Sequence, residues 1–187
     1  MLTMSIKGVD LRLHTNPSLF SPNAPDAGTL AMLSLVQFDP NDKVLDLGCG
    51  YGVVGICAAR LLSPRQVFMT DRDPLAIATA RKNCLENGLE DVTVILSDGF
   101  RELPEANFTK ILSNPPYHVD FSVPKHFIEK GFNRLAIGGA LWMVTKRRPW
   151  YENKLKAIFG GCRVHVVGDY FVFESIKKSA RYANAAR

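Results

Sequence analysis

Residues 44–52, Val-Leu-Asp-Leu-Gly-Cys-Gly-Tyr-Gly, decide how this chain folds. The run begins with apolar and β-branched residues typical of a buried strand and passes directly into closely spaced glycines. Glycines at this position let the chain turn sharply and bring its backbone close to a ligand before a helix begins. The stretch therefore predicts a strand, a tight turn and a helix that together hold a nucleotide-like molecule.

Strands and helices alternate after this stretch. We expect strands at residues 43–47, 66–70, 92–96, 110–113 and 140–145, and helices at residues 53–62, 74–87, 124–136 and 150–159. Gly138-Gly139 is expected to end the third of these helices. Such alternation predicts an α/β fold with a mostly parallel sheet covered by helices on both faces. Two further strands, at 163–167 and 170–174, predict a C-terminal hairpin that adds an antiparallel strand.

The segments on either side of this alternation are simpler. Short strands are expected around Ile6 and at residues 11–13, followed by a loop at residues 21–28. Residues 29–38 are expected to lie on a helix that starts near Asp26, whose carboxylate can cap it. We expect residues 1–176 to form a single domain, and residues 177–187 to be a basic, disordered tail.

The composition is that of an ordinary globular domain. The 187 residues are 47% apolar and 22% charged, and no apolar run approaches the roughly 20 residues that a membrane span needs. The N-terminus lacks a secretory pattern, and the four cysteines show neither a CxxC pair nor zinc spacing. We therefore expect a cytoplasmic protein without a metal site, in which the cysteines are structural thiols.

The glycine stretch fits two kinds of nucleotide. Residues 50–55 match the GxGxxG pattern of dinucleotide sites, and Asp71, at the end of the second strand, can hold ribose hydroxyls in either case. Asp46 precedes the first glycine, where a carboxylate suits the cationic methionyl end of S-adenosylmethionine and repels a pyrophosphate. Asp98 ends the third strand and can accept from an adenine amino group. These acids favour S-adenosylmethionine, although Asp46 can also be a helix cap and Asp98 a turn former.

A second motif, Asn114-Pro115-Pro116-Tyr117, follows the fourth strand. An exocyclic amine or amide nitrogen is a poor nucleophile because its lone pair is delocalised. The Asn114 side-chain carbonyl and the Pro115 backbone carbonyl can accept both N–H groups, which favours a pyramidal nitrogen. The prolines stiffen the loop, and Tyr117 can stack on a planar substrate. The motif predicts methyl transfer to nitrogen, although Asn-Pro and Pro-Pro are also common in plain turns.

The net charge of +5 points only weakly to a nucleic-acid partner, and its distribution is more informative. Lys146, Arg147 and Arg148 form a basic run directly after the fifth strand, at the sheet edge where α/β proteins bind ligands. The run is either a solvated helix start or a set of phosphate contacts to RNA.

In combination, these motifs resemble the small-domain (MTS) branch of class I S-adenosylmethionine methyltransferases, which includes bacterial small-subunit ribosomal RNA guanine-N2 enzymes. The resemblance spans residues 11–176. Besides the two motifs above, it rests on Leu19-Phe20-Ser21, Asp26-Ala27-Gly28-Thr29 and Tyr170-Phe171-Val172-Phe173-Glu174. It implies a Rossmann-like sheet of seven strands with the last one antiparallel, and a loop at residues 26–29 that closes over the cofactor.

The motifs, the basic run and the resemblance together give the expected site residues. Those expected at S-adenosylmethionine are Thr29, Asp46, Gly48, Cys49, Gly50, Asp71, Arg72, Asp98, Gly99 and Asn114. Those expected to act on the target amine are Asn114, Pro115 and Tyr117, and those expected at the substrate or RNA are Pro116, His118, Lys146, Arg147 and Arg148. His118 is either a residue of the substrate pocket or an ordinary loop residue. No metal is implied, and the sequence does not indicate an oligomeric state.

Two departures from the family keep the acceptor open. The longer ribosomal RNA enzymes carry a second, inactive domain, which we do not expect in this chain, and their motif usually ends in Phe where this chain has Tyr117. Tyr also occurs in protein-glutamine and DNA-adenine methyltransferases. We expect a guanine-N2 methyltransferase acting on ribosomal RNA, with protein glutamine or a DNA or RNA adenine as the alternative acceptor. An NAD-dependent oxidoreductase and a catalytically idle RNA-binding fold are remoter alternatives.

Overall fold

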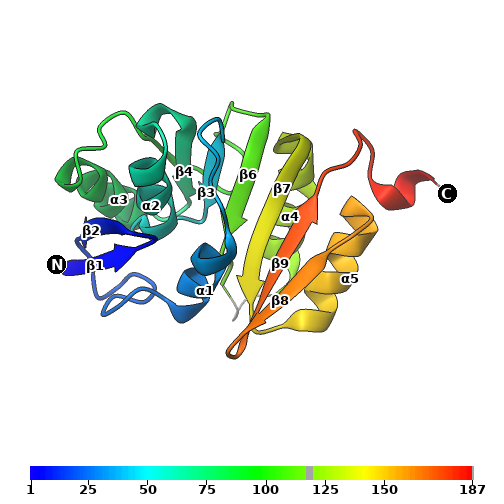
Figure 1. Ribbon diagram of the computed structural model, residues 1–187, viewed down its shortest axis with the longest axis horizontal. Coiled ribbons are helices and arrows are strands. Elements are labelled where there is room, and N and C mark those ends of the chain that lie inside the picture. Colours follow the sequence, from blue (N-terminus) through cyan, green and yellow to red (C-terminus); the bar gives the residue numbers. More distant parts are fainter. Residues whose placement is uncertain (117–119, 187) are drawn as a thin grey trace.

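The computed structural model describes residues 1–116 and 120–186, and in these residues seven strands form one central sheet (Figure 1). They are β3 (Val44–Leu47), β4 (Val67–Asp71), β5 (Thr93–Leu96), β6 (Phe108–Ser113), β7 (Leu135–Thr145), β8 (Arg163–Val167) and β9 (Tyr170–Ile176). The order across the sheet is β5-β4-β3-β6-β7-β9-β8, and β9 runs in the opposite direction to the other six strands. The predicted α/β fold with an antiparallel hairpin strand is confirmed.

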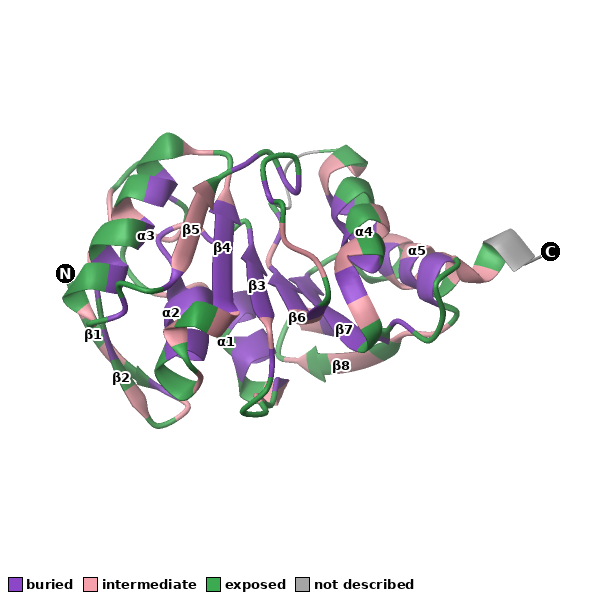
Figure 2. Cartoon of the chain, turned by 90° about the horizontal axis from the view of Figure 1, so that it is seen from above, coloured by how far each residue is buried: buried purple, intermediate pink, exposed green. Residues whose placement is uncertain are grey.

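Helices cover both faces of this sheet (Figure 2). They are α1 (Ala27–Leu35), α2 (Val53–Leu61), α3 (Pro74–Glu86), α4 (Ser122–Arg134) and α5 (Arg148–Phe159), with short 3-10 turns η1 (Pro64–Gln66) and η2 (Ala183–Ala186). Alternate side chains of β7 point to opposite faces of the sheet and belong to two separate hydrophobic cores. Trp142 and Val144 join the core under α1, α2 and α3, whereas Leu141 and Met143 join the core under α4 and α5. This is the period of two that a strand imposes on its side chains.

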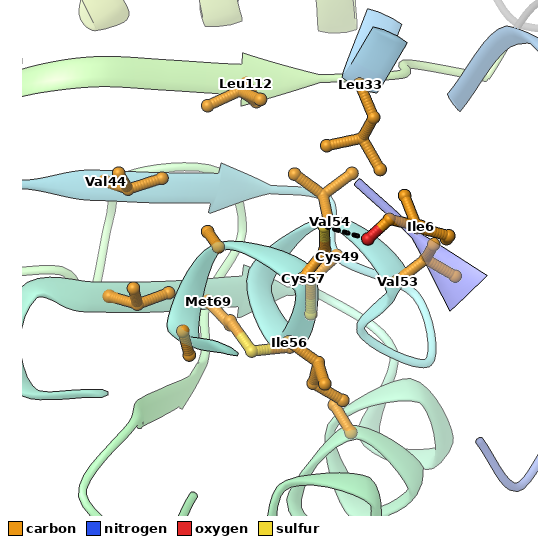
Figure 3. Packing of buried hydrophobic residues seen from close by; sticks show 14 of the residues in the cluster. Ile6, Leu33, Val44, Cys49, Val53, Val54, Ile56, Cys57, Met69 and Leu112 are labelled. Carbon is orange, nitrogen blue, oxygen red and sulfur yellow. Dashed lines mark hydrogen bonds between the residues drawn. The ribbon is translucent and has the colours of Figure 1, made fainter. Parts of the chain in front are cut away.

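The first core layer packs around the strand that begins the glycine stretch. All four residues of β3 are buried, and the strand lies between β4 and β6 in parallel register. Figure 3 shows side chains of α2 and of the glycine turn gathered against Leu33, Val44 and Leu112. Because strand, turn and helix share this core, the turn is held on a rigid base.

The N-terminal residues form a separate hairpin, β1 (Leu2–Ile6) and β2 (Val9–Leu13), that packs beside α2 and α3 (Figure 1). Asn83 of α3 is fully buried and fixes the chain after β2. Its Oδ1 accepts from His14 N at 2.7 Å, and its Nδ2 donates to His14 O and to Tyr51 O. The N-terminal segment is thereby tied to the glycine turn.

Gly138-Gly139 does not end a helix as predicted. The helix α4 ends at Arg134, and β7 begins with the next residue, so both glycines lie inside the strand at a register shift. Gly138 has φ 89°, and a Cβ at Gly139 would lie 2.7 Å from the Phe108 carbonyl oxygen. The glycines therefore permit a strand irregularity and a close backbone approach, rather than a helix stop.

The predicted disorder of residues 177–187 stays a prediction, and two residues of this segment contact the rest of the domain. Lys177 is buried, and its Nζ donates to Leu135 O at 2.7 Å. The Tyr182 ring packs edge-on against Phe132, and its hydroxyl donates to Glu129 O. In residues 1–116 and 120–186, no helix is long and apolar enough to cross a membrane.

Candidate active site

A cavity of about 260 Å³ opens at the carboxyl ends of β3, β4, β5 and β6. This is the edge at which open α/β sheets bind ligands. Twelve residues expected at the cofactor or the target line it: Thr29, Asp46, Gly48, Cys49, Gly50, Asp71, Arg72, Asp98, Gly99, Asn114, Pro115 and Pro116. The structure therefore brings together residues that lie up to 87 positions apart (116 − 29).

The glycine turn is closed by hydrogen bonds within the protein. Gly48 and Gly50 have φ 76° and 55°, which favour glycine. Gly48 N and Cys49 N donate to Thr70 O at 2.8 and 2.9 Å, and Gly50 N donates to the Asp71 carboxylate at 2.8 Å. The N–H groups that would cradle a pyrophosphate at these three positions are therefore already used by the protein itself.

Asp46 lies at the base of this turn and is only 3% exposed. Its Oδ2 accepts from Gly55 N, in the first turn of α2, at 2.8 Å. Burial, with a smaller contribution from the nearby Asp71 carboxylate, raises the Asp46 pKa to about 7, although the hydrogen bond from Gly55 N acts to lower it. Asp46 thus caps α2 and also lines the cavity, where its buried carboxylate favours a cationic group.

The other two acids are held differently. Asp71 accepts from Gly50 N with Oδ2 and from Asp73 N with Oδ1, so its carboxylate is fixed at the end of β4. Asp98 lies at the cavity edge with a side chain 62% exposed, and it forms an ion pair with Arg101 at 3.6 Å. Both carboxylates keep lone pairs for a ligand, because each oxygen can accept more than one hydrogen bond.

Asn114 leaves the end of β6 next to the glycine turn. The buried Ser113 hydroxyl donates to Leu47 O at 2.7 Å, which ties the ends of β6 and β3 together. Asn114 Nδ2 donates to Asp26 Oδ1 at 2.7 Å and to Thr29 Oγ1 at 2.9 Å. Asp26 is also the N-cap of α1, as predicted, because Oδ1 accepts from Thr29 N at 3.0 Å.

The basic run lies outside the cavity on the same edge of the sheet. Lys146, Arg147 and Arg148 are exposed and follow the carboxyl end of β7 directly. Lys146 Nζ lies 4.9 Å from the centre of the Tyr170 ring, and Arg147 Cζ lies 5.5 Å from the centre of the Phe121 ring. Arg148 forms an ion pair with Glu152 at 2.8 Å, which partly neutralises it.

Sequence reasoning did not assign several cavity residues, and two predicted ones cannot be placed. Phe20, Val123 and Phe127 line the cavity and give it apolar walls. Phe127 occupies an apolar position of α4, which is indistinguishable in sequence from ordinary core packing. Tyr117 and His118 lie outside the described residues, so their predicted roles stay predictions.

Burial is the main influence on the thiol pKa of Cys49, which lines the cavity together with Asp46. Its thiol pKa lies well above its ordinary value because of burial and the neighbouring Asp46 and Asp71 carboxylates. A thiol with a raised pKa stays protonated and is a poor nucleophile. Cys49 therefore behaves as a small apolar wall of the cavity.

Comparison with known proteins places this site in a family. The family model described as "Methyltransferase small domain" matches residues 10–174. Ribosomal RNA small subunit methyltransferase C of Pseudomonas syringae is 33% identical over 167 residues, covering 87% of this chain and 50% of that protein. Ribosomal RNA large subunit methyltransferase G of Klebsiella pneumoniae is 29% identical over 174 residues, covering 89% and 46%.

A solved structure agrees with these matches. The 16S ribosomal RNA guanine-N2 methyltransferase of Thermus thermophilus, in complex with S-adenosylmethionine and guanosine, superposes with a TM-score of 0.87 at 29% identity, covering 95% of this chain and 50% of that one. The chain thus spans about half the length of the relatives it matches. With a family model matched over most of its length and a cavity lined by the expected motifs, the chain belongs to the methyltransferase small domain family.

Proposed function

We propose that this chain is an S-adenosylmethionine-dependent N-methyltransferase, and that its acceptor is the exocyclic N2 amine of a guanine in small-subunit ribosomal RNA. One observation carries the proposal. A single cavity is lined both by the acidic glycine turn around Asp46 and by Asn114 and Pro115. A site for a cation and a site for an amine therefore face the same space, as transfer of a methyl group from a sulfonium to nitrogen requires.

The residues present fit S-adenosylmethionine. When bound, it supplies an electrophilic methyl group on a positively charged sulfur. Asp46 holds the cationic methionyl end, Asp71 the ribose hydroxyls and Asp98 the adenine amino group. The buried Thr70 hydroxyl, which lines the cavity, has no hydrogen-bond partner among the described residues and offers the ligand a further polar contact. A dinucleotide fits less well, because its phosphates would face Asp46 and meet N–H groups already used at residues 48–50.

Asn114 and Pro115 act on the acceptor amine. The Asn114 side-chain oxygen and the Pro115 backbone oxygen each accept one N–H, and this pair of contacts favours a pyramidal nitrogen whose lone pair points at the methyl group. No strong base is required, because the proton can leave after transfer. Pro116 continues the stiff loop at the cavity wall. Stacking of Tyr117 on the planar acceptor stays a prediction of the motif, because Tyr117 lies outside the described residues, as does His118.

Ribosomal RNA as the acceptor is supported by the relatives' names and by the surface beside the cavity. Two relatives are named as ribosomal RNA methyltransferases, and the Thermus thermophilus structure is of a 16S guanine-N2 enzyme. Lys146, Arg147 and Arg148 give the same edge of the sheet a positive run that suits phosphates. With this acceptor, the enzyme works in the cytoplasm on RNA or on a small-subunit particle.

An acceptor panel tests the proposal. Labelled methyl transfer is measured to unmodified ribosomal RNA, small ribosomal subunits, adenine-containing DNA and a glutamine-containing peptide. We expect label in the ribosomal RNA, alone or within subunits, recovered as N2-methylguanosine. Asn114→Ala should lose the transfer, while Asn153→Ala, at an exposed position of α5, should keep it. Label confined to DNA or peptide would overturn the guanine assignment, and no detectable S-adenosylmethionine binding would overturn the cofactor.

A further inference from the structure

Both N–H groups of the Asn114 amide have acceptors in the first turn of α1. One is Asp26 Oδ1 at 2.7 Å, and the other is Thr29 Oγ1 at 2.9 Å. A primary amide has two N–H donors on one side and one oxygen on the other. Because of these two contacts, the Asn114 side-chain nitrogen points toward α1. The side-chain oxygen lies on the other side of the planar amide group.

Asp26 makes this orientation unambiguous. An ionised carboxylate only accepts hydrogen bonds, so a reversed amide would place two oxygens against each other at hydrogen-bond distance. Such a reversal costs a hydrogen bond and adds repulsion, and it exposes the N–H groups where the acceptor amine needs an oxygen. The side chain on α1 therefore decides which end of Asn114 faces the acceptor.

The supporting turn is itself held in place. Asp26 Oδ1 also accepts from Thr29 N and caps α1, and Thr29 is only 8% exposed, so water does not readily replace a lost contact. Met32 and Leu33 of α1 are fully buried in the core. The chain just before Asp26 is fastened by the Tyr51 hydroxyl, which donates to Ser21 O at 3.2 Å and Ala24 O at 3.4 Å.

We propose that Asp26 and Thr29 are positioning residues that hold the Asn114 amide with its oxygen toward the acceptor amine. This rests on the proposed function and assigns the N-terminal turn of α1 a part in the methyl transfer itself, beyond closing over the cofactor. Thr29 thereby acts through Asn114. The two residues contribute to catalysis without forming or breaking a bond.

Kinetics separate positioning from cofactor binding. Thr29→Val removes the acceptor at nearly constant volume and should lower kcat roughly tenfold, the value of about one hydrogen bond, with little change in the Kd of S-adenosylmethionine. Thr29→Ser should recover most of the loss. Thr79→Val, on the solvent side of α3, is the matched control and should leave kcat unchanged. In an Asn114→Ala background, Thr29→Val should cause no further loss, because its effect acts through that amide.

Asp26 is tested in the same way. Asp26→Ala removes both contacts of Oδ1 and should lower kcat and also weaken the helix cap. Asp26→Asn keeps an oxygen for both donors and should restore most of the stability and part of the rate. A Thr29→Val or Asp26→Ala enzyme with normal kcat overturns the positioning role while leaving the proposed function intact. A change confined to the Kd of S-adenosylmethionine overturns it as well, in favour of cofactor binding.

A second measurement is independent of turnover. In the nuclear magnetic resonance spectrum, the Asn114 side-chain amide is assigned by the disappearance of its pair of signals in Asn114→Ala. Both protons should exchange slowly with water in the wild type, and one should become fast in Thr29→Val. Fast exchange of both protons in the wild type would show that α1 does not hold the amide, whatever the enzyme methylates.

Discussion

At the scale of a single residue, the Asp46 carboxylate both binds the first turn of α2 and is buried at the base of the cavity. Its carboxylate caps α2 through Gly55 N, yet burial and the Asp71 charge raise its pKa to about 7. A carboxyl group with a raised pKa opposes folding once it is charged, because the charged form is better solvated in the unfolded chain. A bound cation would offset the unfavourable free energy of burying the charged Asp46 carboxylate. Asp46 therefore lowers the stability of the ligand-free protein but favours binding of the cofactor.

The stability of the ligand-free protein should therefore depend on Asp46. Its contribution is fully present below the unfolded pKa of about 4 and is lost as the pH rises through about 7. Asp46→Asn removes the charge and should raise the free energy of unfolding at pH 8 by roughly 1–3 kcal/mol, with the gain shrinking toward pH 5. Denaturant titrations at both pH values test this, with Asp10→Asn, at an exposed strand position, as the matched control. An equal gain at both pH values would contradict it.

Cofactor binding should show the opposite dependence. Between pH 7 and pH 5, protonation of Asp46 competes with the cation, so the Kd of S-adenosylmethionine should rise by up to about tenfold per pH unit. In Asp46→Asn, binding should be weaker at pH 7.5 and nearly independent of pH over this range. Calorimetry at several pH values decides the point. If the Kd of S-adenosylmethionine still depended on pH in Asp46→Asn, a group other than Asp46 would be responsible for the pH dependence.

The limits of sequence reasoning are also clearest at this scale. Acids at the ends of three successive strands favoured S-adenosylmethionine, and they line one cavity because parallel strands present their carboxyl ends at one edge. The contact between Asp26 and Asn114 spans 88 positions and depends on how α1 packs over the sheet. No local pattern encodes such a distance, so the support of the amide emerged only from the structure.

At the scale of elements, α2 packs against β4 with no room for a side chain at Gly55. A Cβ there would lie 2.5 Å from Met69 Cγ and 2.6 Å from Met69 Sδ, and Met69 is fully buried. The last glycine of the apparent dinucleotide pattern therefore serves helix packing. By contrast, Gly138-Gly139 gave a misleading signal, since its partners, Phe108 and Lys177, are distant in sequence.

Close packing of α2 makes a prediction about Gly55→Ala. Alanine favours helix by up to about 1 kcal/mol, but overpacking costs typically 1–3 kcal/mol, so the net change should be a loss of about 1 kcal/mol in the free energy of unfolding. Gly161→Ala, with open space around its Cβ, should be neutral and is the matched control. Gly55→Ala combined with Met69→Val should recover part of the loss. A Gly55→Ala protein more stable than the wild type would contradict the packing argument.

At the scale of the whole molecule, the cavity and the basic run share one edge of the sheet, while the helices run away from that edge toward the other. Lys146, Arg147 and Arg148 follow β7 as Asn114 follows β6. Alternation of strands and helices predicted this arrangement. The packing of Lys177 and Tyr182 after β9 could not be predicted, because a polar, basic composition does not reveal which side chain finds a buried carbonyl or a neighbouring ring.

RNA binding at this edge should be salt-dependent. Replacing Lys146, Arg147 and Arg148 together with Ala should weaken RNA binding and lower the slope of log K against log salt by up to about 3, because each lost phosphate contact removes nearly one released ion. The matched control replaces Arg60, Lys82 and Lys130, which are exposed in the second halves of α2, α3 and α4. Filter binding across a salt series measures both. Equal slopes for the two triple variants would show that RNA does not bind at Lys146, Arg147 and Arg148.

The most direct test of the central claim is a single-turnover transfer from pre-bound, labelled S-adenosylmethionine to unmodified small-subunit ribosomal RNA, followed by digestion to nucleosides. Wild type and Asn114→Ala are compared after equal cofactor loading is verified. We predict label in N2-methylguanosine for the wild type and at least a hundredfold slower transfer for the variant, about the effect of losing one preorganised contact to the reacting group. Equal rates for the two proteins, or label in any other nucleoside, would contradict the account.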